Sequence, residues 1–251
     1  ALVDLGNVVL IRRLTPAQPW AAAVYAVHPV AVLESAHGAH LEPLAILFTL
    51  LALWGLEGGR TLGAIAVMLG GATKLLPVLL VPTAVRRLGA KRAVLGIAAG
   101  LGIAVALAWP VLAAGPALFE AFGTYTAHWS FNGLLHPLLE ASLGAWGRRV
   151  LIGLGGVVAL IAAFLPGRSA WWVVGTGFLV LSPTVHPWYT LWALVPALLL
   201  GRRDWVWASV ALQGSYLVLA TLDGEGGWAP QPWLGPLTWG LALLALYRFR
   251  E

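Results

Sequence analysis

The chain has 251 residues, of which 60% are hydrophobic and only 10% charged, whereas about a quarter of a soluble domain is charged. Apolar runs recur along the whole length with short clusters of charge between them, which does not fit a soluble domain with a single anchor and is typical of a multi-pass α-helical membrane protein. The net charge of +5 comes from scattered basic pairs beside apolar runs, so it indicates anchors at a membrane edge and excludes nucleic acid as the expected partner. With no cysteine, thiol chemistry is excluded.

Taken in chain order, the apolar runs predict an all-α fold: a polytopic transmembrane helical bundle of ten to eleven segments, some half-length or re-entrant, that forms one domain over residues 1–251. The first run, ALVDLGNVVLI, starts at full hydrophobicity without an initiator Met, so we expect that the N-terminal part of the protein is missing. A longer mixed stretch at 115–148 is expected to be an extracytoplasmic loop region. The expected segments are 1–11 (truncated), 20–35, 41–56, 61–73, 75–85, 93–114, 149–165, 170–182, 187–200, 205–222 and 233–247.

Segments 61–73 and 75–85 are short for a membrane crossing, because each reaches only about 20 Å and a hydrocarbon core is about 30 Å thick. They form either one long helix or a hairpin that turns at Thr73-Lys74, and the distribution of basic residues separates the two models. The hairpin leaves twelve basic residues on one side and three on the other, whereas a single helix gives five against nine with Lys74 in mid-membrane. Basic residues favour the cytoplasmic side, so we predict the hairpin. Its twelve inner residues are Arg12, Arg13, Arg60, Arg86, Arg87, Lys91, Arg92, Arg168, Arg202, Arg203, Arg248 and Arg250.

This topology puts the motif ESAHGAHLEP, residues 34–43, on the outer face, together with most of the histidines. Glu42 and Pro43 suit the first turn of a helix, where an anion is stabilised and proline loses no hydrogen bond. Three interpretations of His37 and His40 stay open: polar loop residues at the interface, metal ligands together with Glu42, or one wall of an active-site cavity. We favour the cavity wall modestly, because ionisable groups between membrane segments usually face protein or water.

Three further motifs are predicted at the same face. Lys74, in GGATKLLPVLLVP, either snorkels to water or meets an anion such as a lipid phosphate. The stretch YTAHWSFNGLLHP mixes aromatic rings with polar side chains, which suits a sugar and equally an interfacial aromatic belt. In SPTVHPWYTLW, two prolines break the helix around His186, and such irregular backbone indicates the lining of a cavity. No P-loop and no dinucleotide-binding motif is present, so the sequence gives no support for ATP hydrolysis or dinucleotide chemistry.

In order and spacing, AVYAVHPVAVLESAHGAHLEPLAILFTLLAL, GGATKLLPVLLVP, HWSFNGLLHPLLE and SPTVHPWYTLWALVP resemble the polytopic glycosyltransferases of the GT-C superfamily. The likeness is to bacterial polyprenol-phosphate-mannose-dependent mannosyltransferases of the glycosyltransferase family 87 kind, and it covers most of the chain. His28-Pro29 stands where that family commonly has Asn-Pro, and Ala39-His40-Leu41-Glu42 stands where it has Gly-His-Phe-Asp.

The resemblance implies a hexosyltransferase of the bacterial inner membrane. It would move a hexose, mannose above all, from a polyprenyl-phosphate donor to a glycolipid or glycan acceptor at the extracytoplasmic face, with inversion. The family's catalytic base is an Asp in the first outer loop, expected upstream of this chain, and Asp4 lies within a helix and does not replace it. Lys74 and His186 are the expected ligands of the donor phosphate. The expected cavity and sugar-binding residues are His37, His40, Glu42, His128, Trp129, Asn132, Trp188 and Tyr189.

A cation beside the leaving phosphate would stabilise its developing charge, and Lys74 could supply it. A divalent metal is left open as a cofactor, and no metal-ligating residues are assigned. The rival hypothesis is a non-catalytic lipid or solute transporter, which would also have broken helices and polar groups in the membrane. Transporters usually contain paired inverted repeats, and the sequence shows none.

Overall fold

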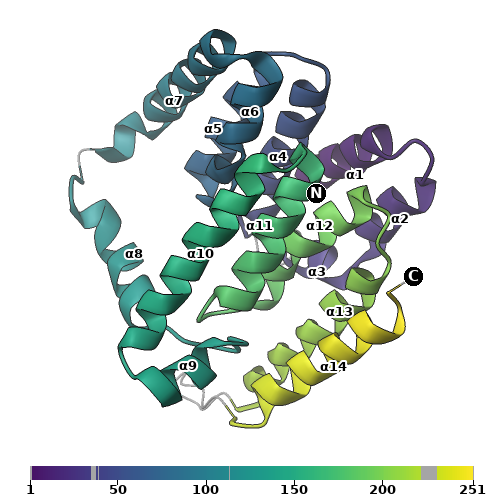
Figure 1. Cartoon of the computed structure of the whole chain (residues 1–251), viewed down its shortest axis with the longest axis vertical. Helices are drawn as coiled ribbons and strands as arrows, with labels where there is room; N and C mark the ends of the chain where they lie inside the picture. Colours follow the sequence, from purple (N-terminus) through teal and green to yellow (C-terminus); the bar gives the residue numbers. More distant parts are fainter. Residues whose placement is uncertain (1, 35–37, 39, 113, 222–230, 251) are drawn as a thin grey trace.

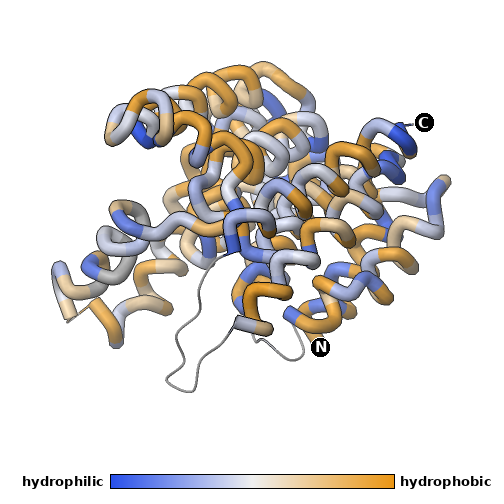
Figure 2. Tube along the Cα trace, turned by 90° about the horizontal axis from the view of Figure 1, so that it is seen from below, coloured by the Kyte–Doolittle hydropathy of each residue, from blue (hydrophilic) through white to orange (hydrophobic). Residues whose placement is uncertain are grey.

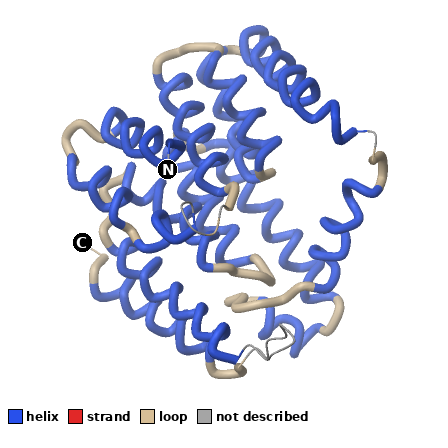
Figure 3. The backbone as a smooth tube through the Cα atoms, turned by 180° about the vertical axis from the view of Figure 1, so that it is seen from behind, coloured by secondary structure: helices blue, strands red, loops and turns tan. Residues whose placement is uncertain are grey.

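A computed structural model describes the chain except for residues 1, 35–37, 39, 113, 222–230 and 251. The described part is all-helical, as the sequence predicts, and its only β-type pairing is the pair of isolated bridges that Phe131 and Asn132 make with Thr184 (Figure 3). Hydrophilic residues gather at many of the turns and at the C-terminal end, while much of the helical trace is hydrophobic (Figure 2).

The N-terminal helices build the larger of the buried apolar clusters together with helices from the C-terminal half. Two prolines break this part of the chain. Pro29 ends helical continuity after His28, whose backbone is extended. Near Lys74 the chain likewise leaves the helix before Pro77. The elements are α1 (Leu2–Leu14), α2 (Pro19–Val27), α3 (Pro29–Val32), α4 (Glu42–Glu57), α5 (Leu62–Thr73), the 3-10 helix η2 (Leu76–Leu80) and α6 (Val81–Leu88).

The turn predicted at Thr73-Lys74 is confirmed. Helix α5 ends at Thr73, Lys74 is extended (φ −150°, ψ 134°), and η2 folds back against α5. The close approach needs the absent side chain of Gly71, since a Cβ there would lie 2.4 Å from Cγ2 of Val78. Lys74 therefore lies at the tip of a hairpin and not in the middle of a long helix.

Two helices are long and apolar enough to cross a membrane: α7 (Ala90–Leu112) and α10 (Trp146–Phe164). Only 11% and 17% of their apolar windows are buried, so most of their hydrophobic surface faces outward. Helix α7 lies at one edge of the molecule, whereas α10 runs beside α11 (Figure 1). Among the described residues the other helices are too short to cross a membrane once, because prolines and short turns divide them. The larger number of crossings expected from the sequence therefore stays a prediction.

The expectation of a loop region at 115–148 differs from the structure, which is largely helical there. Helix α8 (Ala117–His128) and helix α9 (His136–Leu143) occupy most of the stretch, and α10 already begins at Trp146. Prolines explain where the helices start: Pro116 precedes α8 and Pro137 occupies the first turn of α9, where no hydrogen bond is lost. The polar and aromatic mixture that indicated a loop lies on helices and in the short link 129–135.

The C-terminal helices pack on one another and supply a second apolar cluster. Helix α13 lies against α14 and also contacts α12 (Figure 1). The elements are α11 (Gly167–Leu181), the 3-10 helix η3 (Pro187–Thr190), α12 (Leu191–Leu199), α13 (Asp204–Leu212), the 3-10 helix η4 (Gln213–Thr221) and α14 (Leu234–Arg248).

The turns that carry the twelve grouped basic residues contact one another at one end of the molecule. Arg168 holds Glu57 with two hydrogen bonds of 2.6 and 2.7 Å and reaches the carbonyl oxygen of Leu199 at 3.5 Å. Arg92 donates to the carbonyl oxygen of Gly59 at 2.6 Å. The guanidinium of Arg203 lies 5.0 Å from the ring of Trp20, and the rings of Trp207 and Phe249 are 5.5 Å apart. We call this the basic end.

Candidate functional site

Away from the basic end, segments from four parts of the sequence meet. These are Glu34 and residues 40–43 before and at the start of α4, the hairpin tip at Lys74, the end of α8 with the link 129–132, and 183–189 between α11 and η3. Their side chains build one polar and aromatic cluster, which we call the polar cluster. Its members are Glu34, His40, Glu42, Lys74, Tyr125, Trp129, Phe131, His186, Trp188 and Tyr189.

An ion pair joins Glu42 to Lys74 at the centre of the cluster. Helix α4 begins at Glu42, so the carboxylate lies at the positive end of the helix, as predicted. Its side chain is completely buried, and Oε1 lies 2.9 Å from the Nζ of Lys74, which is 37% exposed. Neither carboxylate oxygen has a hydrogen-bond donor among the described residues, so the contact with Lys74 is an ion pair. Lys74 therefore does not simply snorkel to water: it compensates a buried charge while its outer side stays accessible.

A stack of three rings lies beside this pair. Trp188 is in the middle, with His40 on one face at a centroid distance of 3.8 Å and His186 on the other at 4.4 Å. The Nε2 of His40 lies 3.1 Å from Oε2 of Glu34, whose side chain is buried. The stack fixes the orientation of both imidazoles, and it connects His40, just before α4, to the 183–189 segment.

Short backbone pairing positions His186. The amide of Phe131 donates to the carbonyl oxygen of Pro183 at 3.0 Å, and the amide of Val185 donates to the carbonyl oxygen of Phe131 at 2.7 Å. Gly133 is required by this pairing, because a Cβ there would lie 2.8 Å from the oxygen of Pro183. The irregular backbone predicted around His186 is thus held by the link that follows α8.

Burial shifts the pKa of three groups in the cluster. For Glu34, burial and then the nearby Glu42 raise the pKa from 4.5 to about 7. Burial followed by the positive charges of His40 and Lys74 lowers the pKa of His186 to about 4. Burial also lowers the pKa of His40, against the opposing effect of Glu42. His186 is therefore neutral near pH 7.

The aromatic residues of the sequence prediction lie around the same cluster. Trp129 is 45% exposed, and its ring centroid lies 6.4 Å from that of His186. The hydroxyl groups of Tyr189 and Tyr125 are hydrogen-bonded at 2.9 Å. An exposed indole next to paired hydroxyls is a surface that can stack on a sugar ring and hydrogen-bond its hydroxyls.

Of the remaining residues that were predicted to bind the sugar, one is buried in the cluster and the others lie elsewhere or outside the described part of the chain. Glu42 is too deeply buried for the expected contact with a sugar. Asn132 has a left-handed backbone (φ 53°) and anchors the link to α14, since its Oδ1 accepts from Thr238 at 2.9 Å and its carbonyl oxygen accepts from Trp239 at 2.8 Å. His128 is exposed at the end of α8. His37 lies outside the described residues.

Three members of the cluster were not predicted as site residues: Glu34, Tyr125 and Phe131. Glu34 is in the quoted motif, six residues before His40, but nothing in a sequence shows that the segment closes on itself to join them. Tyr125 precedes the predicted Trp129 by four residues, which is one helical turn, and this spacing was the available signal.

Behind the cluster, a buried chain of hydrogen bonds supports the start of α4. The Nδ2 of Asn7 donates to the carbonyl oxygen of Pro43 at 3.1 Å and to the hydroxyl of Tyr25 at 2.8 Å. That hydroxyl donates to Oδ1 of Asp4 at 3.1 Å. Asp4, in α1, therefore helps to hold the hydrogen-bonded chain behind the cluster.

His28 lies at the α2–α3 break, and its Nδ1 accepts a hydrogen bond from the amide of Val30. Nε2 therefore carries the proton and donates to the Oγ of Ser209 at 2.9 Å.

Within the described residues, no group of three or more His, Asp or Glu side chains is arranged to hold a metal ion. The metal interpretation of His40 and Glu42 also needs His37, so it is not decided by this arrangement. No family model, no curated protein and no solved structure matches this chain. The likeness to GT-C enzymes therefore rests on the sequence motifs.

Proposed function

We propose that the protein is a multi-pass membrane glycosyltransferase. It moves a hexose, mannose above all, from a polyprenyl-phosphate donor to a lipid or glycan acceptor at the extracytoplasmic face, with inversion at the sugar. The observation that carries this proposal is the ion pair of Lys74 with buried Glu42, in one cluster with the exposed ring of Trp129 and away from the basic end.

Lys74 is suited to stabilise the leaving group. As the bond between sugar and phosphate breaks, negative charge grows on the polyprenyl phosphate, and a fixed cation close to it lowers the barrier. An ammonium group has three hydrogen-bond donors, and Lys74 contacts Glu42 at 2.9 Å as an ion pair. Glu42 then acts as a positioning residue that aims Lys74, and the proposal assigns no general base to this chain.

The aromatic side of the cluster is suited to bind the sugar. Trp129 offers an exposed indole face, and the Tyr125–Tyr189 pair offers hydroxyl groups. His186 is neutral near pH 7, so its role is a hydrogen bond to the sugar or the phosphate and not an ion pair. The stack on Trp188 keeps both imidazoles in place for this contact.

The separation of charge supports the proposed orientation. Twelve basic residues share the basic end, and basic residues favour the cytoplasmic side of a membrane. The polar cluster would then face outward, where polyprenyl-phosphate sugars are used by this class of enzyme. Because the chain has no cysteine, single cysteines at exposed His128 and exposed Arg87 test the orientation. An impermeant thiol reagent added outside intact cells should label His128→Cys. The same reagent should label Arg87→Cys only after the cells are lysed. The reverse pattern of labelling contradicts the orientation.

Donor binding tests the function directly. Polyprenyl-phosphate-mannose is titrated into the protein in detergent micelles, and binding is followed by tryptophan fluorescence. Replacing Lys74 alone would leave Glu42 buried without its partner, so the test variant is the neutral pair Glu42→Gln/Lys74→Gln. We expect its affinity to fall about tenfold or more, the effect of losing one charge-assisted hydrogen bond. Polyprenol without phosphate is the control ligand, and both proteins should bind it equally.

Transfer is then measured in membranes with labelled donor. In the full-length protein, we expect labelled mannose in the acceptor fraction with the wild-type pair and none above background with the double variant. Equal donor binding by the two proteins would refute the role of Lys74. Labelled donor that crosses the membrane without any covalent product would instead identify a transporter.

A further inference from the structure

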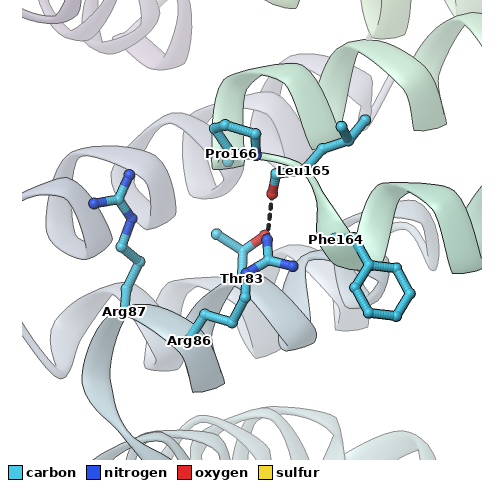
Figure 4. Close-up of a pocket in the computed structure, with 7 residues that line it drawn as sticks. Thr83, Arg86, Arg87, Phe164, Leu165 and Pro166 are labelled. Atoms are coloured by element: carbon cyan, nitrogen blue, oxygen red, sulfur yellow. Dashed lines mark hydrogen bonds between the residues drawn. The ribbon is translucent and has the colours of Figure 1, made fainter.

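A second candidate site lies at the basic end, on the opposite side from the polar cluster. A surface pocket of about 340 Å³ opens between the end of α6 and the turn that joins α10 to α11. Arg87 stands on one side of it, and Pro166 and Leu165 form the other (Figure 4). The pocket is lined by Thr83, Arg86, Arg87, Phe164, Leu165, Pro166 and Gly167.

The two arginines of the pocket differ in their bonding. Arg86 is fixed, since its Nη2 donates to Oγ1 of Thr83 at 3.3 Å and to the carbonyl oxygen of Leu165 (Figure 4). Arg87 is exposed and makes no hydrogen bond or ion pair with any residue that the structure describes. One guanidinium thus shapes the wall, and the other is available for a ligand.

Nothing acidic lines the pocket. The described acidic residues of the basic end are both engaged: Glu57 in two hydrogen bonds from Arg168, and Asp204 in an ion pair with Arg202. The positive charge of the pocket is therefore not compensated within the described part of the chain, and an anion is the complementary ligand.

The rim of the pocket is apolar on the side of α10. Phe164 is 78% exposed, and Leu160 and Ile161, one turn earlier, are 62% and 50% exposed. They belong to a helix long and apolar enough to cross a membrane, only 17% of whose apolar window is buried. A ligand that meets both surfaces must carry an anionic group and hydrocarbon chains together.

We propose that this pocket binds the headgroup of an acidic phospholipid. The phosphodiester accepts hydrogen bonds from Arg87, and the acyl chains lie over Phe164 and the exposed face of α10. Basic pockets between membrane helices on the cytoplasmic side are suited to such headgroups. This site is separate from the polar cluster and does not depend on the proposed transfer reaction.

The experiment measures lipid retention by native mass spectrometry. The full chain is released from mixed micelles that contain phosphatidylglycerol and phosphatidylcholine in equal amounts. The wild-type protein should retain phosphatidylglycerol in preference. The variant Arg87→Gln should lower this retention about fivefold, which corresponds to about 1 kcal/mol for one arginine near anionic lipid. Arg87→Lys, which keeps the charge, should restore most of the preference.

The matched control is Arg13→Gln, the same change of charge at an exposed arginine of the basic end outside the pocket. Its retention should equal that of the wild-type protein. An equal loss in Arg13→Gln, or equal retention of the two lipids by the wild-type protein, would overturn the proposal. Inorganic phosphate is the remaining arm: if millimolar phosphate abolishes the lipid preference, the pocket is a site for free anions and the proposal fails.

Discussion

Removing Lys74 should destabilise the protein more than removing its ion-pair partner Glu42. Lys74→Gln leaves a fully buried carboxylate without its cation, whereas Glu42→Gln leaves an ammonium that is 37% exposed and can turn to water. Removing one partner of a fully buried pair costs about 3–5 kcal/mol. Because Lys74 is partly exposed, solvent screens some of the loss, and we expect about 2–3 kcal/mol for Lys74→Gln. For Glu42→Gln we expect about 1 kcal/mol, as for a surface pair.

The double variant removes both charges together and should cost no more than Glu42→Gln alone. The coupling between the two sites is then about 2 kcal/mol, well above the value for independent positions. Thermal unfolding in detergent, followed by the fluorescence of the 14 tryptophans, measures all four proteins. A chain of this size loses about 2–4 °C in Tm for each kcal/mol, so Lys74→Gln should unfold roughly 4–12 °C below the wild-type protein. Equal Tm values for Lys74→Gln and Glu42→Gln would show that the buried carboxylate does not depend on Lys74.

Three further outcomes are expected. Burial raises the pKa of Glu34 from 4.5 to about 7, so the folded state binds this proton more tightly than the unfolded state does. The resulting stabilisation is complete below pH 4.5 and is lost as the pH rises through 7. The Tm of the wild-type protein should therefore fall between about pH 5 and 7, and the Tm of Glu34→Gln should fall less steeply. The pKa of His186 is about 4, so His186→Gln should lower the affinity for the donor by the same factor at every pH between about 5.5 and 8. If the wild-type affinity changes with pH in this range and the variant's does not, His186 is protonated when it binds the donor. A Cβ on Gly175 would lie 1.9 Å from the carbonyl oxygen of Trp192, so Gly175→Ala should cost about 1–3 kcal/mol in thermal unfolding, whereas Gly153→Ala, with nothing within 4 Å, should be neutral or stabilising.

Much of the helical layout follows from local chemistry, and the sequence predicts it. Prolines and apolar runs locate the ends of helices within a few residues: α4 begins at Glu42 and α5 ends at Thr73, as predicted. The count of basic residues selects the hairpin, because charge asymmetry is a property of composition that needs no coordinates. The stretch 115–148 was predicted less well, since its polar and aromatic residues obscured the helices that Pro116 and Pro137 start.

The site itself depends on contacts between segments far apart in the sequence. Nothing local to Lys74 indicates that its partner is Glu42, or that this partner is completely buried. The histidines show the same limit: the charge count predicts which face His186 lies near, but only the stack on Trp188 and the burial around it decide that it is neutral. A sequence reports which groups can ionise, whereas the free energy of ionising them depends on the solvent and charges that the folded chain puts around them.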